Sequence, residues 1–177
     1  VAVAVGYGQL RWELQQDRRV EVHDRTNIRY LDPQVIGEPA QLIVGDLSFI
    51  SLKLVIPALV SASTLDAEYL LMVKPQFEVG RERLGAGGVV RDLEDHFLTV
   101  MGVILSAADN GLGLKRVAAS PLPGPSGNVE YFIYLGRGVT MPSNLKIKDM
   151  VKTAIAAGPA GKPGNNLDEQ VKEETDE

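Results

Sequence analysis

Residues 41–75 read QLIVGDLSFISLKLVIPALVSASTLDAEYLLMVKP, and this stretch decides the fold. It contains two short, largely apolar runs without charge, Gln41–Gly45 and Tyr69–Val73, which are typical of buried strands. The segment between them, Ile50–Val60, has a helical pattern that Pro57 should kink or shorten. A strand, a helix and a second strand in this order predict a βαβ unit, which is the building block of α/β folds with parallel strands.

Short strands and helical segments alternate through the rest of the chain. Leu93–Asn110 has the clearest helical pattern, with its apolar residues on one face, Asp92 as a candidate N-cap and Asn110-Gly111 as a stop. The further predicted strands are Val1–Val5, Val20–His23, Leu114–Ala119 and Val129–Leu135, and the further predicted helices are Gln9–Gln16 and Asn144–Ala157. Turn chemistry marks Thr26–Gly37, and four glycines mark Gly80–Gly88 as a mobile loop. The alternation predicts an α/β fold with a mostly parallel sheet.

The two ends of the chain differ in character. The sequence begins at Val1 rather than at Met and reads as a strand from its first residues, so we expect a fragment whose upstream part is missing. From Gly158 onward the chain has no aromatic residue and only two large apolar residues. Such a composition does not offset the entropy of ordering. We therefore expect one folded domain over residues 1–157 and a disordered acidic tail over residues 158–177.

The composition excludes several kinds of site. The 177 residues include no Cys and two His, which excludes disulfides, thiolate catalysis, Cys-based zinc sites and multi-His metal sites. The net charge of −5 is unfavourable for binding nucleic acid. However, residues 158–177 hold two lysines against six acidic residues and account for −4 of that charge. The predicted domain is therefore nearly neutral, and the charge does not argue against an RNA partner.

Charged residues stand at the ends of the predicted strands. Asp46 follows Gln41–Gly45 and Lys74 follows Tyr69–Val73. Because ligands of open parallel sheets collect outside the carboxyl ends of the strands, both are candidate site residues. Glu130 is a third candidate, placed just inside the predicted strand that starts at Val129. Each residue alone is also explained as a strand-end cap, a surface ion pair or an edge-strand gatekeeper, but two charges at adjacent strand ends favour a site.

Other candidate motifs are weaker. Gly6-Tyr7-Gly8 forms a glycine turn between a strand and a helix, but it lacks the spacing of a dinucleotide fingerprint. No Walker A sequence is present, and residues 124–128 (GPSGN) lack the spacing of a nucleophile elbow. We expect His23 and His96 at the surface or on a helix flank rather than as general bases. Phosphate-loop and hydrolase functions therefore have little support.

Six motifs occur in a fixed order, at residues 5–10 (VGYGQL), 24–27 (DRTN), 46–52 (DLSFISL), 73–78 (VKPQFE), 87–92 (GGVVRD) and 120–132 (SPLPGPSGNVEYF). With these motifs, essentially the whole predicted domain resembles the TlyA family of ribosomal RNA methyltransferases, whose members also carry the name hemolysin A. That family belongs to the FtsJ-like 2′-O-methyltransferases, which bind S-adenosylmethionine on a Rossmann-like fold. The resemblance implies a mostly parallel sheet with an antiparallel last strand. It also implies that the family's first strand, glycine-rich cofactor loop and S4-type RNA-binding domain are missing from this sequence.

The resemblance gives the strand-end residues a catalytic role. FtsJ-like enzymes use a Lys-Asp-Lys-Glu tetrad, and its last three members match Asp46, Lys74 and Glu130, while the first lysine lies upstream in the family. The reaction moves a methyl group from a sulfonium to a ribose 2′-hydroxyl by in-line displacement, so the hydroxyl must be positioned and relieved of its proton. Lys74 would act as the base or would stabilise the developing alkoxide. Asp46 and Glu130 would orient it.

The same resemblance implies binding roles for other residues. The residues implied for S-adenosylmethionine are Gly6, Tyr7, Thr26, Asn27, Asp46 and Leu47, with Thr26 and Asn27 at the adenine end and Asp46 near the sulfonium. The residues implied for RNA are Arg81, Arg83, Ser126 and Asn128, although a solvated loop explains the arginines equally well. No metal is expected. Ala4 departs from the family, which usually has an acidic residue there to hold the ribose hydroxyls of the cofactor.

Three functions compete. The leading hypothesis is a cytoplasmic RNA ribose 2′-O-methyltransferase domain that modifies a cytidine of ribosomal RNA, with ribosomal RNA or a ribosomal subunit as its partner. A non-catalytic RNA- or ribosome-binding module of the same fold is the alternative, which Ala4 and the missing upstream part favour. A membrane-active hemolysin is disfavoured, because the sequence has no spanning run and no basic amphipathic helix. Loss of a central strand should expose apolar edges, so we also expect marginal stability or self-association.

Overall fold

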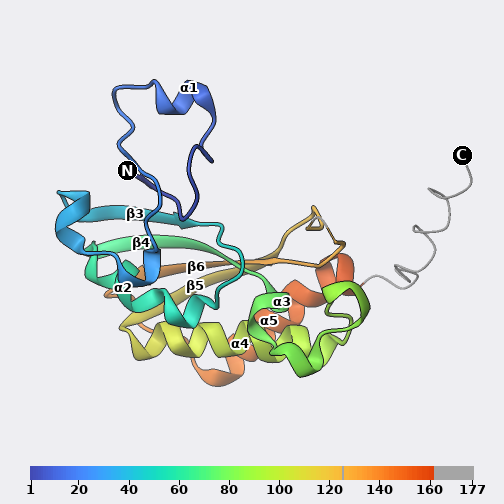
Figure 1. Cartoon of the computed structure of the whole chain (residues 1–177). Coiled ribbons are helices and arrows are strands. Elements are labelled where there is room, and N and C mark those ends of the chain that lie inside the picture. The colour runs from blue at the N-terminus through green and yellow to red at the C-terminus, as the bar shows by residue number, and fades with distance from the viewer. Residues whose placement is uncertain (125, 162–177) are drawn as a thin grey trace, which may run out of the picture.

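A four-stranded sheet forms the centre of the protein in the computed structural model, which describes residues 1–124 and 126–161 (Figure 1). The strands are β3 (Ala40–Gly45), β4 (Ser63–Val73), β5 (Leu112–Ala119) and β6 (Tyr131–Arg137), in the spatial order β3-β4-β6-β5. β3 runs parallel to β4, whereas β6 runs antiparallel to both β4 and β5. Three strands of this sheet therefore share one direction and the last one is reversed. This confirms the α/β class and the antiparallel last strand.

The connection between β3 and β4 is less helical than the sequence predicts. A 3-10 turn, η3 (Leu52–Leu54), precedes the short helix α2 (Ile56–Ser61). Pro57 lies in the first turn of α2, where its missing N–H leaves no hydrogen bond unmade, so it helps to start the helix instead of kinking it. β4 begins six residues earlier than predicted, because Ser63 pairs with Ala40 of β3 and Glu68 pairs with Leu42 of β3 and Gly136 of β6.

Helices cover one face of the sheet. Figure 1 shows α2, α3 (Pro75–Glu78), α4 (Leu93–Asp109) and α5 (Asn144–Ala157) on the same side of the strands. The two long helices have nearly the bounds expected from the sequence. The Asp92 side chain accepts a hydrogen bond from the N–H of Glu94, and Gly111 follows α4 with a φ of +77°, as a glycine stop requires.

Alternation along β4 and β6 builds the core beneath these helices. Tyr69 pairs with Leu135 and Leu71 pairs with Ile133, and all four side chains are fully buried. They pack in one cluster with buried residues of α4 and α5, namely Val100, Val103, Ile104, Ala107, Ile147 and Val151. The period-2 pattern thus places every second residue of the central strands against the helices.

The opposite face of the sheet carries exposed apolar side chains. On β3, Leu42 is 60% exposed and Val44 is 69% exposed. Val44 pairs with Leu70 of β4, which is also exposed, so these side chains share one face. Apolar side chains are therefore exposed at β3, which is an edge strand of the four-stranded sheet.

The N-terminal residues form a small unit of their own. β1 (Ala2–Val3) and β2 (Val22–His23) pair in parallel as a separate two-stranded sheet, and α1 (Trp12–Gln15) lies between them in the chain. These three elements are shorter than the predicted Val1–Val5, Val20–His23 and Gln9–Gln16. Figure 1 shows that this N-terminal arm projects from the body beside β3. Two 3-10 turns, η1 (Ile28–Tyr30) and η2 (Pro33–Ile36), connect it to the main sheet.

The remaining segments differ from the prediction in detail. β5 begins two residues early, and β6 covers Tyr131–Arg137 instead of Val129–Leu135. The glycine-rich loop contains two 3-10 turns, η4 (Arg81–Arg83) and η5 (Ala86–Gly88). A further turn, η6 (Pro159–Gly161), extends regular structure past residue 157, and residues 162–177 of the predicted tail lie outside the described residues. In the described part of the chain, no helix has the length and apolarity that crossing a bilayer requires.

His96 is a core residue, which corrects the expectation of a surface or helix-flank position. It lies in the first turn of α4 and is 2% exposed. Its Nε2 lies 3.0 Å from the carbonyl oxygen of Val90, and its ring packs edge-on against Tyr131 with 5.6 Å between the ring centroids. Burial lowers the pKa of His96 below its ordinary value, because the interior disfavours the charged imidazolium.

We expect the free energy of unfolding to decrease as the pH falls from about 6.5, the ordinary pKa of histidine, toward the lowered pKa of folded His96. Over this window the unfolded imidazole takes up a proton and the folded one does not, so protonation favours the unfolded state. One proton contributes a slope of at most about 1.4 kcal/mol per pH unit. Denaturant unfolding measured between pH 8 and pH 5 gives this slope.

The variant His96→Phe should flatten the slope. If this variant keeps the wild-type slope, His96 is not its source.

Candidate active site

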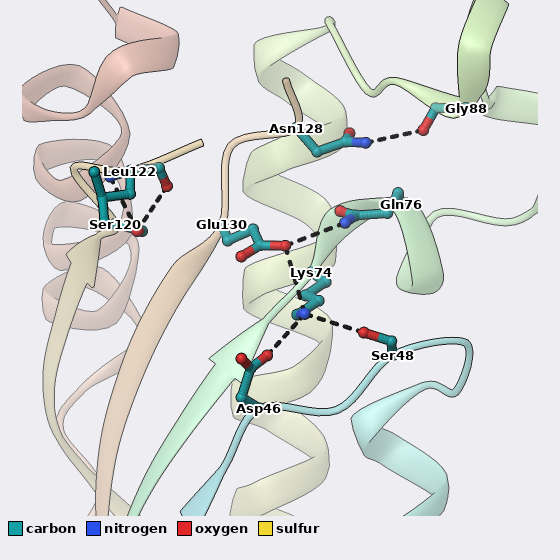
Figure 2. A network of polar contacts seen from close by, with 9 residues as sticks. All are labelled: Asp46, Ser48, Lys74, Gln76, Gly88, Ser120, Leu122, Asn128 and Glu130. Carbon is teal, nitrogen blue, oxygen red and sulfur yellow. Dashed lines mark hydrogen bonds and ion pairs between the residues drawn. The ribbon is translucent and has the colours of Figure 1, made fainter. Parts of the chain in front are cut away.

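The parallel pairing of β3 and β4 brings Asp46 and Lys74 together. Gly45, the last residue of β3, pairs with Leu71 of β4, and the two charged residues follow their strands at the same edge of the sheet. The Nζ of Lys74 lies 2.7 Å from Oδ1 of Asp46. Figure 2 shows this ion pair. The strand-end argument therefore predicted a real contact between these two side chains.

Glu130 reaches the same place because β6 is antiparallel to β4. Val73 pairs with Tyr131, so the start of β6 lies beside the end of β4. Glu130 precedes β6 by one residue and does not lie inside the strand as predicted. Its Oε1 lies 3.7 Å from Nζ of Lys74 and accepts a hydrogen bond from Nε2 of Gln76 at 3.3 Å (Figure 2).

The environment of the Lys74 ammonium group is strongly acidic and only partly dry. The side chains of Lys74 and Glu130 are 12% and 8% exposed, while that of Asp46 is 65% exposed. Lys74 also donates to Oγ of Ser48 at 3.2 Å. One nitrogen with three N–H groups thus has three oxygen partners. This cluster of Asp46, Ser48, Lys74 and Glu130 is named the lysine cluster below.

A cavity of about 1040 Å³ opens beside the lysine cluster. Its lining combines segments that are far apart in the chain: Asn27, Arg29, Tyr30, Ser48, Phe49, Ile50, Ser51, Leu54, Lys74, Gln76, Phe77, Arg81, Leu84, Gly88, Gly124, Ser126, Asn128 and Glu130. The predicted residues in this lining are Asn27, Lys74, Arg81, Ser126, Asn128 and Glu130. The volume is large enough for a nucleotide, and the open sheet edge gives it access to solvent.

Several predicted cofactor residues lie away from this lining. Gly6 and Thr26 join the ends of the N-terminal arm, since the carbonyl of Gly6 accepts from the N–H of Arg25 and the N–H of Thr26 donates to the carbonyl of Ala4. Tyr7 is exposed on the same arm, with the guanidinium of Arg25 over its ring. Leu47 packs against the core. Asp46 is outside the lining too, but it forms an ion pair with the lining residue Lys74.

Two of the predicted RNA residues have structural partners. Arg83 donates to Oδ1 of Asp95 at 2.7 Å, which ties the glycine-rich loop to the first turn of α4. Asn128 is buried and accepts from the N–H of Val90 at 3.0 Å, while its Nδ2 donates to the carbonyl of Gly88 at 3.1 Å (Figure 2). Its amide therefore shapes the cavity wall by joining two loops.

Sequence reasoning missed the aromatic wall of the cavity. Phe49 is 89% exposed, has a φ of +63°, and lies with its ring centroid 5.0 Å from that of Phe77. Tyr30 adds a third ring, with the guanidinium of Arg29 over it. Both phenylalanines stand inside the quoted motifs next to Asp46 and Lys74, which is the signal that could have identified them.

Comparisons with known proteins identify the family of the chain. A sequence profile described as FtsJ-like methyltransferase matches residues 1–137. The 16S/23S rRNA (cytidine-2′-O)-methyltransferase TlyA of Mycobacterium tuberculosis is 49% identical over 160 residues, which are 90% of this chain and 60% of that protein. The 23S rRNA (cytidine-2′-O)-methyltransferase TlyA of Campylobacter jejuni is 35% identical over 135 residues, which are 75% of this chain and 51% of that protein.

A solved structure shows the same fold. A hemolysin-named protein from Streptococcus thermophilus matches with a TM-score of 0.78 and 36% identity, over 86% of this chain and 56% of that one. The chain spans between 48% and 60% of the length of the curated relatives that it matches. The three charged residues of the lysine cluster all lie within the matched residues 1–137.

The amide of Asn128 should control the order of the glycine-rich loop. In Asn128→Ala, the N–H of Val90 and the carbonyl of Gly88 lose their buried partners, so we expect a loss of about 1–3 kcal/mol in unfolding free energy. Backbone amides from Gly85 to Val90 should exchange with solvent faster than in the wild type, as hydrogen exchange measures.

The control is Asn144→Ala at the exposed start of α5, which should leave loop exchange unchanged. Wild-type exchange of residues 85–90 in Asn128→Ala would show that other contacts hold this loop.

Proposed function

Because the chain belongs to the FtsJ-like methyltransferase family, we propose that it carries the catalytic domain of an RNA ribose 2′-O-methyltransferase. The observation that supports this most is the position of the Lys74 ammonium group between the carboxylates of Asp46 and Glu130, beside a nucleotide-sized cavity. The names of the mycobacterial and Campylobacter relatives make a cytidine of ribosomal RNA the proposed substrate. We also propose that this enzyme acts in the cytoplasm, on ribosomal RNA that is free or part of a subunit.

The lysine cluster is suited to hold and activate a hydroxyl group. A ribose hydroxyl is a poor nucleophile, so its oxygen must be positioned and its developing charge must be neutralised. Of the contacts of Lys74, those to Ser48 at 3.2 Å and Glu130 at 3.7 Å are the longest. We propose that the substrate hydroxyl replaces one of them. Three oxygen partners around one ammonium favour stabilisation of the alkoxide over a role of Lys74 as the base. The proton of the hydroxyl would then pass to a carboxylate of the cluster, that of Asp46 or Glu130.

The cofactor site is incomplete in the described residues. When bound, S-adenosylmethionine supplies the methyl group as an electrophile. Asn27 lies in the cavity lining, and Asp46 offers an exposed carboxylate toward a positive sulfonium. Ala4, in contrast, has no side-chain acceptor for ribose hydroxyls, and the carbonyl of Ala4 is occupied by the N–H of Thr26. The residues present therefore fit part of the cofactor only, and we expect weak binding by this chain.

The aromatic part of the cavity lining fits an unstacked nucleotide. The rings of Tyr30, Phe49 and Phe77 offer faces on which a base can stack, and Arg29 and Arg81 offer charges for phosphates. Enzymes that modify a nucleotide inside structured RNA take it out of the base stack, which requires such a pocket. These contacts support RNA over a small-molecule substrate.

Removal of the Lys74 ammonium should abolish methyl transfer. In a full-length relative that carries the same lysine, Lys74→Ala should lower kcat by about 100-fold or more, because a preorganised charge at the reacting oxygen is lost. Transfer of labelled methyl groups to ribosomal RNA measures the rate, and calorimetry should show that the cofactor still binds.

The matched control is Lys115→Ala, which removes a lysine that pairs with Glu68 and has no part in the lysine cluster. Turnover retained in Lys74→Ala would refute the assignment of Lys74.

A non-catalytic RNA-binding module is the second candidate, and Ala4 is the observation that favours it. We expect titration calorimetry to show little or no S-adenosylmethionine binding by the 177-residue chain. Ala4→Glu should strengthen binding, because a carboxylate there accepts hydrogen bonds from ribose hydroxyls. Tight binding by the unmodified chain would refute the claim that Ala4 weakens the site.

A further inference from the structure

Glu78 is a buried carboxylate outside the cavity lining, and sequence reasoning gave it no role. It is the last residue of α3, and its side chain is 2% exposed. Its Oε2 accepts from the hydroxyl of Ser51 at 2.6 Å, and its Oε1 accepts from the N–H of Leu52 at 2.7 Å. Lys53 is its nearest cation, with Nζ 3.9 Å away. Both carboxylate oxygens are thus bound to one short segment, residues 51–53.

These bonds connect the two segments that carry the lysine cluster. α3 follows Lys74 directly, since Lys74 is its N-cap residue. Residues 51 and 52 end the loop that begins at Asp46 and includes Ser48, two partners of Lys74. A second contact between the same segments is the ring pair Phe49 and Phe77. Glu78 therefore joins the segment that carries Lys74 to the loop that carries Asp46 and Ser48. These two joined segments are called the frame below.

Burial of this carboxylate costs desolvation free energy, and an uncharged side chain could fill the same space without that cost. Desolvation raises the pKa of Glu78 above its ordinary value, although the bonds from Ser51 and Leu52 and the charge of Lys53 act against this rise. A buried charge is often replaceable by an uncharged side chain without loss of stability. What an apolar side chain could not supply here is a pair of acceptors directed at Ser51 and Leu52.

We propose that Glu78 is a positioning residue for methyl transfer, which holds the Asp46–Leu52 loop so that Asp46 and Ser48 meet the ammonium group of Lys74. This inference rests on the proposed function. Glu78 acts through the loop and touches neither the cavity nor the reacting atoms. Its removal should therefore affect the rate of the chemical step more than the binding of RNA.

The test compares Glu78→Ala with Glu78→Gln in a full-length relative that carries the same glutamate. Glu78→Ala should lower kcat about 10- to 100-fold, the scale of a misplaced catalytic group, with KM for RNA changed less than about threefold. Glu78→Gln should restore most of kcat, because its carbonyl can accept from Leu52 and its amide can donate to Ser51. Glu68→Ala, at an exposed glutamate paired with Lys115, should retain full activity.

Two further measurements separate the possible failures. In the 177-residue chain, hydrogen exchange of residues 47–52 should become faster in Glu78→Ala and in Ser51→Ala. The second variant keeps the carboxylate and tests the same bond if Glu78→Ala does not fold. In the relative, the double variant Glu78→Ala/Ser48→Ala should lower kcat by a smaller factor than the product of the factors for the two single variants.

Wild-type kcat in folded Glu78→Ala, no rescue by Glu78→Gln, or unchanged loop exchange in both variants would each overturn the positioning role. A wild-type relative without any methyl transfer would overturn the proposed function, while the exchange experiment would still report on the frame.

Discussion

The ammonium group of Lys74 lies between the carboxylates of Asp46 and Glu130 at one edge of the sheet. Two carboxylates close to each other repel, and a cation between them offsets this repulsion. The offset matters here because the side chain of Glu130 is nearly buried. The arrangement depends on strand direction: β3 and β4 must end, and β6 must begin, at one edge. Topology and electrostatics therefore constrain each other at this point.

Part of this arrangement follows from local sequence patterns, namely a charged residue directly after an apolar run. Asp46 and Lys74 each end an apolar run, and parallel strands bring such ends together, so their contact could be predicted. The approach of Glu130 required knowledge that β6 is reversed, which the family resemblance supplied and the local pattern did not. Glu130 was also placed inside the strand, because Val129 and Tyr131 alternate with it as strand residues would.

Other features could not be predicted, because they depend on partners distant in sequence or on backbone shape. Asn128 bonds to groups about 40 residues earlier, and the family resemblance, which implied an RNA contact for it, gives no sign of these bonds. The local sequence predicts His96 on a helix flank, and only its tertiary contacts with Val90 and Tyr131 show that the side chain is buried. The left-handed backbone of Phe49 has no local cue, since such a conformation favours glycine. In each case, tertiary contacts decide the position of the side chain.

Irregular segments around the cavity are held by single buried polar side chains. Asn128 joins the glycine-rich loop to the segment before β6, and Glu78 joins α3 to the loop after β3. In both cases a buried side chain supplies a hydrogen-bond partner to backbone groups outside the pairing of strands and helices. A cavity lined by loops and short helical turns can therefore keep a fixed shape.

The uncovered face of the sheet bears on the calorimetric behaviour of the chain. Unfolding raises the heat capacity mainly because apolar surface enters water, by about 12–15 cal/mol/K per residue in ordinary domains. The side chains of Leu42, Val44 and Leu70 are already exposed in the folded chain and add little to that change. The stability curve of this chain should therefore be flatter against temperature than that of a domain of equal length with both sheet faces covered.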